Sequence, residues 1–229
     1  MALILNIETS ETICSVALAK GNDLIAIKES TEERSHAKLV TVFIEEIFKD
    51  LEYTLQDLDA IAVTKGPGSY TGLRIGVSTA KGLCYGLNIP LISVGTLTAL
   101  ANATINTGKY NNHKFCPMID ARRMEVYSAI YNSDLSKIKN VSADILTEES
   151  YSSYLNSDKI VFVGSGSAKF NEILSNNNAI FNTDIVPSAK NMIEVSYKNF
   201  KDEKFEDVAY FEPYYLKDFI AIKPKNKIF

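Results

Sequence analysis

Hydrophobic and polar positions alternate along the first thirty residues and then change their period. Alternating or continuous apolar runs predict strands at residues 2–8, 13–19 and 24–29, and Gly21-Asn22-Asp23 supplies a hairpin turn before the third. From residue 35 to about 51 the apolar positions recur at helical spacing, and Ser35 is the predicted N-cap. Beyond this helix the pattern predicts further strands and helices. They are strands at 59–64 and 91–94, and helices at 71–87 and 96–103.

Three strands followed by alternating helices and strands predict a mixed sheet with helices packed against it. After a polar, Asn-rich stretch at 102–113, the order partly restarts. It continues with strands at 115–119, 124–131 and 159–163, and helices at 167–174 and 188–200. We therefore predict an α/β protein of two lobes, residues 1–104 and 105–229. The second lobe is expected to be a degenerate copy of the first, on element order alone.

Composition narrows the class of protein. The 229 residues carry a net charge of −4, which argues against binding nucleic acid without a partner. No apolar stretch approaches the roughly 20 residues that span a bilayer, and the N-terminus lacks the features of a signal peptide. Three widely spaced cysteines, Cys14, Cys84 and Cys116, are expected to be small core residues. We expect a reducing compartment, the cytoplasm, and no membrane contact.

A glycine-rich block runs from Gly66 to Gly76, where a predicted strand enters a helix. Gly66 and Gly68 permit a close backbone approach, and Ser69 or Thr71 can cap the helix. The block is either an anion-binding turn near a nucleotide, which Arg74 could face, or a tight turn that binds nothing. It is not a Walker loop, since no Gly-Lys-Ser/Thr follows.

Small residues form a stripe along the helix that follows. Gly72, Gly76, Ala80 and Cys84 recur every four residues, and Gly82 and Gly86 make a second small pair on a different face. Because each helical glycine costs about 1 kcal/mol relative to alanine, the stripe predicts a close approach by another element. That element is either the chain's own sheet or a second subunit.

The first predicted helix has two adjacent apolar rows, Leu39, Phe43 and Ile47 beside Val40, Ile44 and Phe48. This face is wider than one sheet requires, so one row is available to a partner unless the helix is buried on both sides. Together the two helices give a candidate partner interface. Its members are Leu39, Val40, Phe43, Ile47, Gly72, Gly76 and Ala80.

Catalytic chemistry has little support in the sequence. The chain has two histidines, and the position four residues after His36 holds Val40 instead of a second metal ligand. No base stands at a recognisable spacing from a nucleophile. The N-terminal hairpin has no glycine between Met1 and Gly21, and Glu8 and Glu11 place negative charge where nucleotide phosphates would sit. We therefore predict no catalytic residue, no metal and no cofactor.

A polar group at Asp120, Arg122 and Glu125 lies near the join of the two predicted lobes. These side chains either make a polar contact between the lobes or decorate a hairpin.

Several segments, in order along almost the whole chain, resemble the bacterial TsaB (YeaZ) family. They are residues 6–10 with 14–18, 66–76 with Lys81-Gly82-Leu83, Ile119-Asp120-Ala121-Arg122 with Glu125-Val126-Tyr127, Val163-Gly164-Ser165-Gly166, and Glu212-Pro213-Tyr214-Tyr215-Leu216. The glycine block and the Asp-Ala-Arg segment are the most specific of these. One departure is Glu8, where TsaB proteins commonly have Asp.

The resemblance implies a duplicated actin-like, sugar-kinase-type ATPase fold with ribonuclease H-like lobes. It also implies a role in threonylcarbamoyl-adenosine modification of tRNA beside the anticodon. In that family TsaB is a non-catalytic subunit that pairs with the TsaD transferase through its first two helices, and TsaE joins as an ATPase. We expect a homodimer in isolation and tRNA contact only through the complex. The alternative is a stand-alone enzyme of this fold, a small-molecule kinase or a glycoprotease-type metallopeptidase.

Overall fold

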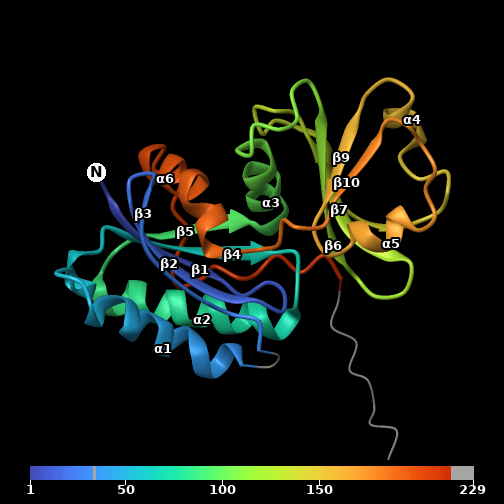
Figure 1. The fold of residues 1–229 in the computed structure, drawn as a ribbon. Coiled ribbons are helices and arrows are strands. Elements are labelled where there is room, and N and C mark those ends of the chain that lie inside the picture. The colour runs from blue at the N-terminus through green and yellow to red at the C-terminus, as the bar shows by residue number, and fades with distance from the viewer. Residues whose placement is uncertain (33–34, 218–229) are drawn as a thin grey trace, which may run out of the picture.

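Two lobes, each built around a five-stranded sheet, make up the part of the chain described here (Figure 1). The structure is a computed structural model, and it describes residues 1–32 and 35–217. Both sheets are mixed and carry helices, so the prediction of a two-lobed α/β protein is confirmed.

The first sheet has the strand order β3-β2-β1-β4-β5. Its strands are β1 (Leu3–Glu8), β2 (Cys14–Lys20), β3 (Asp23–Ser30), β4 (Ala60–Gly66) and β5 (Leu91–Gly95). The first three strands form an antiparallel meander, whereas β4 and β5 run parallel to β1. Every residue of β1 is buried, because this strand is central and both faces of the sheet are covered.

The second sheet repeats this plan in the order β10-β9-β6-β7-β8. Its strands are β6 (Lys114–Asp120), β7 (Glu125–Tyr131), β8 (Lys137–Ile145), β9 (Ile160–Val163) and β10 (Ala179–Asn182). Again three strands form an antiparallel meander, and β9 and β10 run parallel to the first of them. The two sheets correspond strand for strand, which confirms the predicted duplication.

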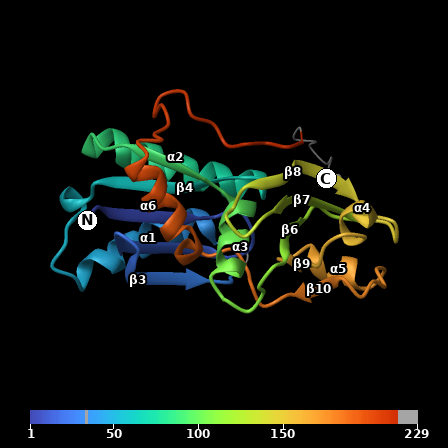
Figure 2. The ribbon, with the colours of Figure 1, turned by 90° about the horizontal axis from the view of Figure 1, so that it is seen from above.

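Helices divide between the two faces of the first sheet. The helical segments are α1 (His36–Lys49), α2 (Tyr70–Leu87), α3 (Thr96–Ile105), α4 (Ser152–Leu155), α5 (Ser167–Asn171) and α6 (Ile193–Lys201), with 3₁₀ turns η1 (Leu55–Asp57) and η2 (Ala189–Met192). Helices α1 and α2 cover one face, and α6 covers the other (Figures 1 and 2). Helix α3 lies between the lobes, with Ala99 against the first sheet and Leu97 and Leu100 against the second. The boundary predicted at residue 104 falls within α3 and stays a prediction.

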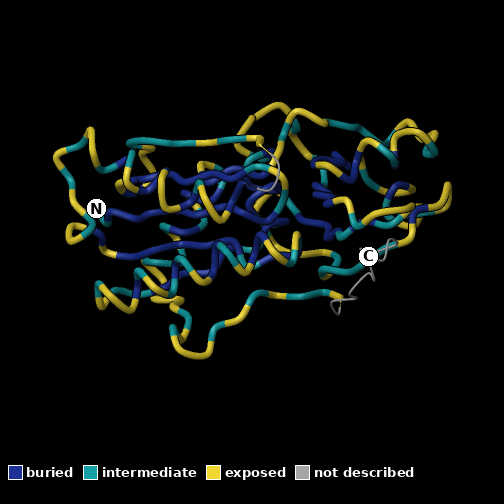
Figure 3. Tube along the Cα trace, turned by 90° about the horizontal axis from the view of Figure 1, so that it is seen from below, coloured by how far each residue is buried: buried dark blue, intermediate teal, exposed yellow. Residues whose placement is uncertain are grey.

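Burial follows this layering (Figure 3). Strands β1, β2, β4 and β5 run through the interior and the edge strand β3 does not, while further exposed positions gather on loops and on the outward faces of the helices. Cys14, Cys84 and Cys116 are buried and form no disulfide, as predicted. Within the described residues no helix is long and apolar enough to cross a membrane.

The C-terminal part of the chain returns to the first lobe and then reaches the second. Beyond α6, the carbonyl oxygens of Ala209 (3.1 Å) and Phe211 (3.0 Å) accept hydrogen bonds from the Lys81 ammonium on α2. The Tyr214 amide then donates to the carbonyl of Lys65 at 2.7 Å. Figure 2 shows this segment, in red, passing α2 on its way to the second lobe. It therefore links the two lobes.

Candidate functional site

Most of the predicted interface residues on α1 face the chain's own core. Val40, Phe43 and Ile47 are 1%, 9% and 2% exposed and pack with β1, β2 and β4 residues. Leu39 is half-buried against the same cluster. The prediction that Val40, Phe43 and Ile47 bind a partner is therefore wrong, because the sheet of the same chain occupies their face.

The small-residue stripe on α2 is likewise internal. Gly72, Gly76 and Ala80 are buried, and a Cβ added at Gly72 would overlap the carbonyl oxygen of Thr9. At Gly76 it would overlap the Thr9 hydroxyl, which itself donates to the Gly72 carbonyl at 2.8 Å. The stripe admits the loop between β1 and β2, so its assignment to a partner is wrong and the alternative of internal packing holds.

The opposite side of the same two helices is open. A groove of about 750 Å³ lies between α1 and α2 and is closed at one end by the turn around η1. It is lined by Thr41, Ile44, Glu45, Phe48, Lys49, Tyr53, Thr54, Leu55, Gln56, Ser78, Thr79, Gly82 and Leu83. Its walls are mainly apolar, and charged side chains contribute at Glu45 and Lys49.

Two glycines on this outward side have no intrachain reason to be glycine. A Cβ added at Gly82 or at Gly86 would meet nothing within 4 Å, and both residues are exposed in the middle and last turns of α2. The sequence signal for this side was the second small pair, which was noted but not placed in the predicted interface.

The predicted anion-binding turn is filled by the chain itself. A Cβ on Gly68 would overlap the Ser10 carbonyl oxygen, and that same oxygen accepts a hydrogen bond from the Ser69 amide at 2.6 Å. Gly66 has φ of 107° and lies against the Tyr214 backbone. Ser69 caps α2 by accepting from the Gly72 amide at 3.3 Å, whereas Thr71 is exposed. The turn is therefore tightly packed within the chain, and anion binding there stays a prediction.

Arg74 does not point toward a vacant anion position. Its Nε donates to the Tyr215 hydroxyl at 3.3 Å, and its guanidinium lies 4.5 Å from the centroid of the Tyr70 ring. The two tyrosine rings are themselves 4.6 Å apart. The hydrogen bond to Tyr215 raises the pKa of Arg74 above its ordinary value. Arg74 thus fastens the C-terminal segment to the start of α2.

The predicted polar group of the second lobe divides into two kinds of contact. The Asp120 amide donates to the Ser165 hydroxyl at 3.0 Å, and that hydroxyl donates to the Glu11 carboxylate of the first lobe. Arg122 instead belongs to the turn of its own hairpin, with φ of 69° and its amide bonded to the Asp120 carboxylate at 2.6 Å. Glu125 forms an ion pair with Lys217. The bond between the lobes is thus made by Ser165, while the Asp120 carboxylate pairs with Lys169 of its own lobe at 3.2 Å and Arg122 belongs to the hairpin.

Two carboxyl groups lie close together, one at the end of β1 and one in the loop that follows it. Glu8 is 0% exposed, its Oε1 accepts from the Ser10 amide and the Thr64 hydroxyl, and its Oε2 has no hydrogen-bond partner. Burial raises the pKa of Glu8 to about 7. Burial also raises the pKa of Glu11 to about 7, and the nearby carboxyl groups of Glu8 and Asp120 add to this rise. The hydrogen bond from Ser165 acts in the opposite direction and lowers the pKa. The surroundings of both carboxyl groups therefore favour their neutral form.

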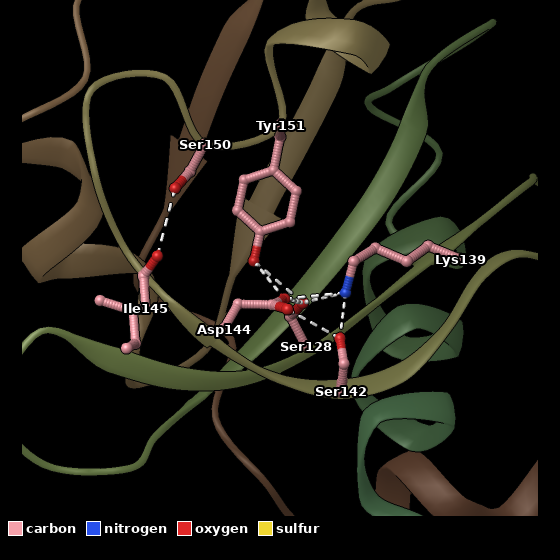
Figure 4. A network of polar contacts seen from close by, with 7 residues as sticks. All are labelled: Ser128, Lys139, Ser142, Asp144, Ile145, Ser150 and Tyr151. Atoms are coloured by element: carbon pink, nitrogen blue, oxygen red, sulfur yellow. Dashed lines mark hydrogen bonds and ion pairs between the residues drawn. The ribbon is translucent and has the colours of Figure 1, made fainter.

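In the second lobe, the Asp144 carboxylate is surrounded by three hydroxyl groups and the Lys139 ammonium (Figure 4). The Asp144 carboxylate accepts from the Tyr151 hydroxyl at 2.8 Å and from Lys139 at 2.8 Å, and Ser128 and Ser142 also donate to it. Burial alone would raise the pKa of Asp144, but these hydrogen bonds lower it below its ordinary value. Lys139 is thus held by the Asp144 carboxylate, and the network packs β7, β8 and Tyr151 together.

Metal ligands do not converge in the described part of the chain. Over residues 1–32 and 35–217, no group of three or more His, Cys, Asp and Glu side chains is placed to hold an ion. The expectations of no metal and no cofactor stay predictions.

Comparison with known proteins places these features in a family. Residues 29–224 match the family model of TsaD, tRNA N6-adenosine threonylcarbamoyltransferase. The chain is 30% identical over 230 residues to the Haemophilus influenzae tRNA threonylcarbamoyladenosine biosynthesis protein TsaB, covering 96% of this chain and 95% of that protein. The Escherichia coli protein of the same name is 30% identical over 226 residues, with 96% of each chain covered.

Solved structures are similar over almost the whole chain. YeaZ from Pseudomonas aeruginosa has a TM-score of 0.80 at 24% identity and covers 94% of this chain and 100% of its own. A second Pseudomonas aeruginosa protein, described as similar to peptidase YEAZ, has a TM-score of 0.82 at 22% identity and covers 95% and 100%. The two-lobed fold is therefore shared along the length of the chain.

Proposed function

Since this chain belongs to the TsaB family of tRNA threonylcarbamoyladenosine biosynthesis proteins, we propose that it is a non-catalytic subunit that docks onto a TsaD-type transferase. The complex modifies tRNA next to the anticodon, and a TsaE-type ATPase joins it. The α1–α2 groove is the docking surface, and this groove is the observation that carries the proposal.

Gly82, which lines the groove, and Gly86, one turn further along α2 and outside the lining, support this use of the surface. Glycine inside a helix costs about 1 kcal/mol relative to alanine, and Gly82 and Gly86 recover none of this through contacts within the chain. A helix of a partner can approach a glycine-lined surface more closely than one with larger side chains. The half-buried side chains of Phe48 and Leu83 would then lose their contact with water. The same groove pairs two copies of the chain when the transferase is absent.

The side chains found where a phosphate loop or a catalytic base would be needed support a non-catalytic role. Glu8 at the end of β1 and Glu11 in the loop after it stand in the hairpin where a phosphate loop would need glycine, and the loop packs against the glycines of α2. Lys139 is committed to Asp144. The chain therefore contributes a surface, and it reaches tRNA only within the complex.

Reconstituted tRNA modification tests the proposal. The assay contains tRNA, the transferase, the ATPase and their small substrates, with wild-type chain, Gly82→Leu or no chain. Gly82→Leu places a side chain in open space and raises helix propensity, so the subunit stays folded while its groove is blocked. We expect modification to fall to the level without the chain, and co-elution with the transferase to be lost.

Lys201→Leu is the matched control, because it adds the same side chain at an exposed site on α6, across the sheet from the groove. It should support modification and co-elution like the wild type. Equal modification with and without the chain would contradict the subunit role, and full activity of Gly82→Leu would contradict the groove. Micromolar binding of magnesium-ATP or zinc to the purified chain in calorimetry would favour the stand-alone enzyme.

A further inference from the structure

A second cavity, of about 570 Å³, lies between the two lobes and shares no lining residue with the α1–α2 groove. Its first-lobe wall is formed by the carboxyl ends of β4 and β5 and by the first turn of α3. Its second-lobe wall comes from residues 131–141, at the β7–β8 hairpin. Open α/β sheets bind ligands at the carboxyl ends of their parallel strands, and this volume is typical of a small-molecule pocket.

The lining has a definite charge. It contains two lysines, Lys65 from the first lobe and Lys137 from the second, and no Asp or Glu among the described residues that form it. Asn140 and Asn199 add side-chain amides. Apolar side chains such as Val94 and Leu97 supply the rest of the surface. The cavity therefore suits a molecule with a negative group and an apolar body.

The first-lobe wall is held in place before any ligand arrives. Lys65 Nζ donates to the Ser93 hydroxyl at 3.1 Å, and that hydroxyl donates to the carboxylate of Glu206 behind it. The Tyr214 amide, on the C-terminal segment, donates to the Lys65 carbonyl at 2.7 Å. Fixed donors lower the entropic cost of binding.

The two walls also contact each other directly. The hydroxyls of Thr98, on α3, and Tyr131, at the end of β7, are 3.0 Å apart. Lys137 is exposed, and within the described residues its ammonium has no ion-pair or hydrogen-bond partner. Its charge is therefore available to a molecule that enters the cavity, whereas the Lys65 ammonium already donates to the Ser93 hydroxyl.

We propose that this inter-lobe cavity binds a small organic anion, a carboxylate or a phosphate monoester with a compact apolar body, between Lys65 and Lys137. The ligand contacts both lobes and holds them together. This site is separate from the loop that carries Glu8 and Glu11, and it does not depend on the proposed docking function.

Isothermal titration calorimetry on the full chain tests the proposal, in low-salt buffer without phosphate. Benzoate and phenyl phosphate are the anionic probes, and benzamide presents a similar ring without charge. We expect at least one anion to bind with a Kd below about 1 mM and more tightly than benzamide. The tighter of the two anions identifies whether the ligand carries a carboxylate or a phosphate group.

Lys137→Glu should weaken the anion at least about tenfold, because it reverses the free charge at the cavity. Lys159→Glu is the matched control, since Lys159 is exposed and lies outside the cavity lining. Asn140→Trp, at an exposed lining position, should abolish binding by filling the space while the fold persists. Any of three results would overturn the site: no anion binding above benzamide, equal weakening by both lysine variants, or wild-type affinity in Asn140→Trp.

Discussion

The hydroxyl of Ser165, in the second lobe, donates a hydrogen bond to the carboxylate of Glu11, in the first. Ser165 also accepts from the Asp120 amide, so the bond ties the β6–β7 hairpin to the loop after β1. Glu8, which is fully buried, ends β1 directly before this loop, and the loop packs against Gly72 and Gly76 of α2. The contact between the lobes is therefore built on acidic groups whose protonation differs between the folded and unfolded chain.

The first prediction concerns the pH dependence of stability. The pKa values of Glu8 and Glu11 rise from 4.5 in the unfolded chain to about 7 in the fold. Between these values the native state binds more protons, so the free energy of unfolding falls as pH rises from 4.5 to 7 and levels off above. The contribution of Glu8 is on the order of 3 kcal/mol. Urea unfolding at pH 5, 6, 7 and 8 measures it.

Glu8→Gln isolates that contribution, because glutamine keeps an acceptor for the Ser10 amide without carrying a charge. We expect the variant to be more stable than the wild type at pH 8 and to lose much of the slope between pH 5 and 7. Glu148→Gln, at an exposed position, should leave the slope unchanged. A Glu8→Gln curve parallel to that of the wild type would show that Glu8 is not protonated in the fold.

The second prediction compares two glycines of one helix. Gly76→Ala should lower the free energy of unfolding by about 1–3 kcal/mol, because the new methyl group overlaps the Thr9 hydroxyl. Gly82→Ala should raise it by up to about 1 kcal/mol, since the methyl group meets nothing and the helix gains propensity. Urea unfolding of both variants gives the sign of each change. The same sign at both positions would contradict the placement of the two faces of α2.

These two glycines also show where sequence reasoning stops. The four-residue recurrence of Gly72, Gly76 and Ala80 predicts a close approach, and the structure has one. Periodicity gives the face of a helix but not the identity of what covers it, because a loop from residue 9 and a helix from another subunit both require small side chains. The partner assignment was therefore wrong although the helix and its stripe were right.

The second lobe illustrates a different limit. Strands β6, β7 and β9 were predicted because they are continuous apolar runs. Strand β8 was missed because it lies at the sheet edge and carries Lys139, Ser142 and Asp144, whose polar pattern resembles a loop. Strand β10 has four residues, too few for a periodic signal. Strands β8 and β10 both form because they pair with neighbouring strands of the sheet, and this pairing leaves no local signal in the sequence.

The third prediction concerns the C-terminal segment. Lys81→Met removes the ammonium that bonds the Ala209 and Phe211 carbonyls but keeps an apolar stem of similar length. We expect faster amide hydrogen exchange in residues 207–217 and little change in the strands, because the core is untouched. Lys109→Met, an exposed site with no side-chain hydrogen bond in the described structure, is the control. Unchanged exchange in Lys81→Met would mean that the other contacts of the segment, such as those of Tyr214, Tyr215 and Lys217, are enough to hold it.

The last prediction tests the Asp144 network as a structural unit. Asp144→Asn leaves the partly buried Lys139 charge without its carboxylate, and breaking such a pair costs roughly 3 kcal/mol. Lys139→Met alone likewise leaves Asp144 with fewer donors. The double variant removes both charges. Its loss of unfolding free energy should therefore be at least about 1 kcal/mol smaller than the sum of the losses in the two single variants. Urea unfolding of all four chains completes the cycle. Additive losses would show that Ser128, Ser142 and Tyr151 satisfy Asp144 without Lys139, and that the ion pair contributes nothing to the β7–β8 hairpin.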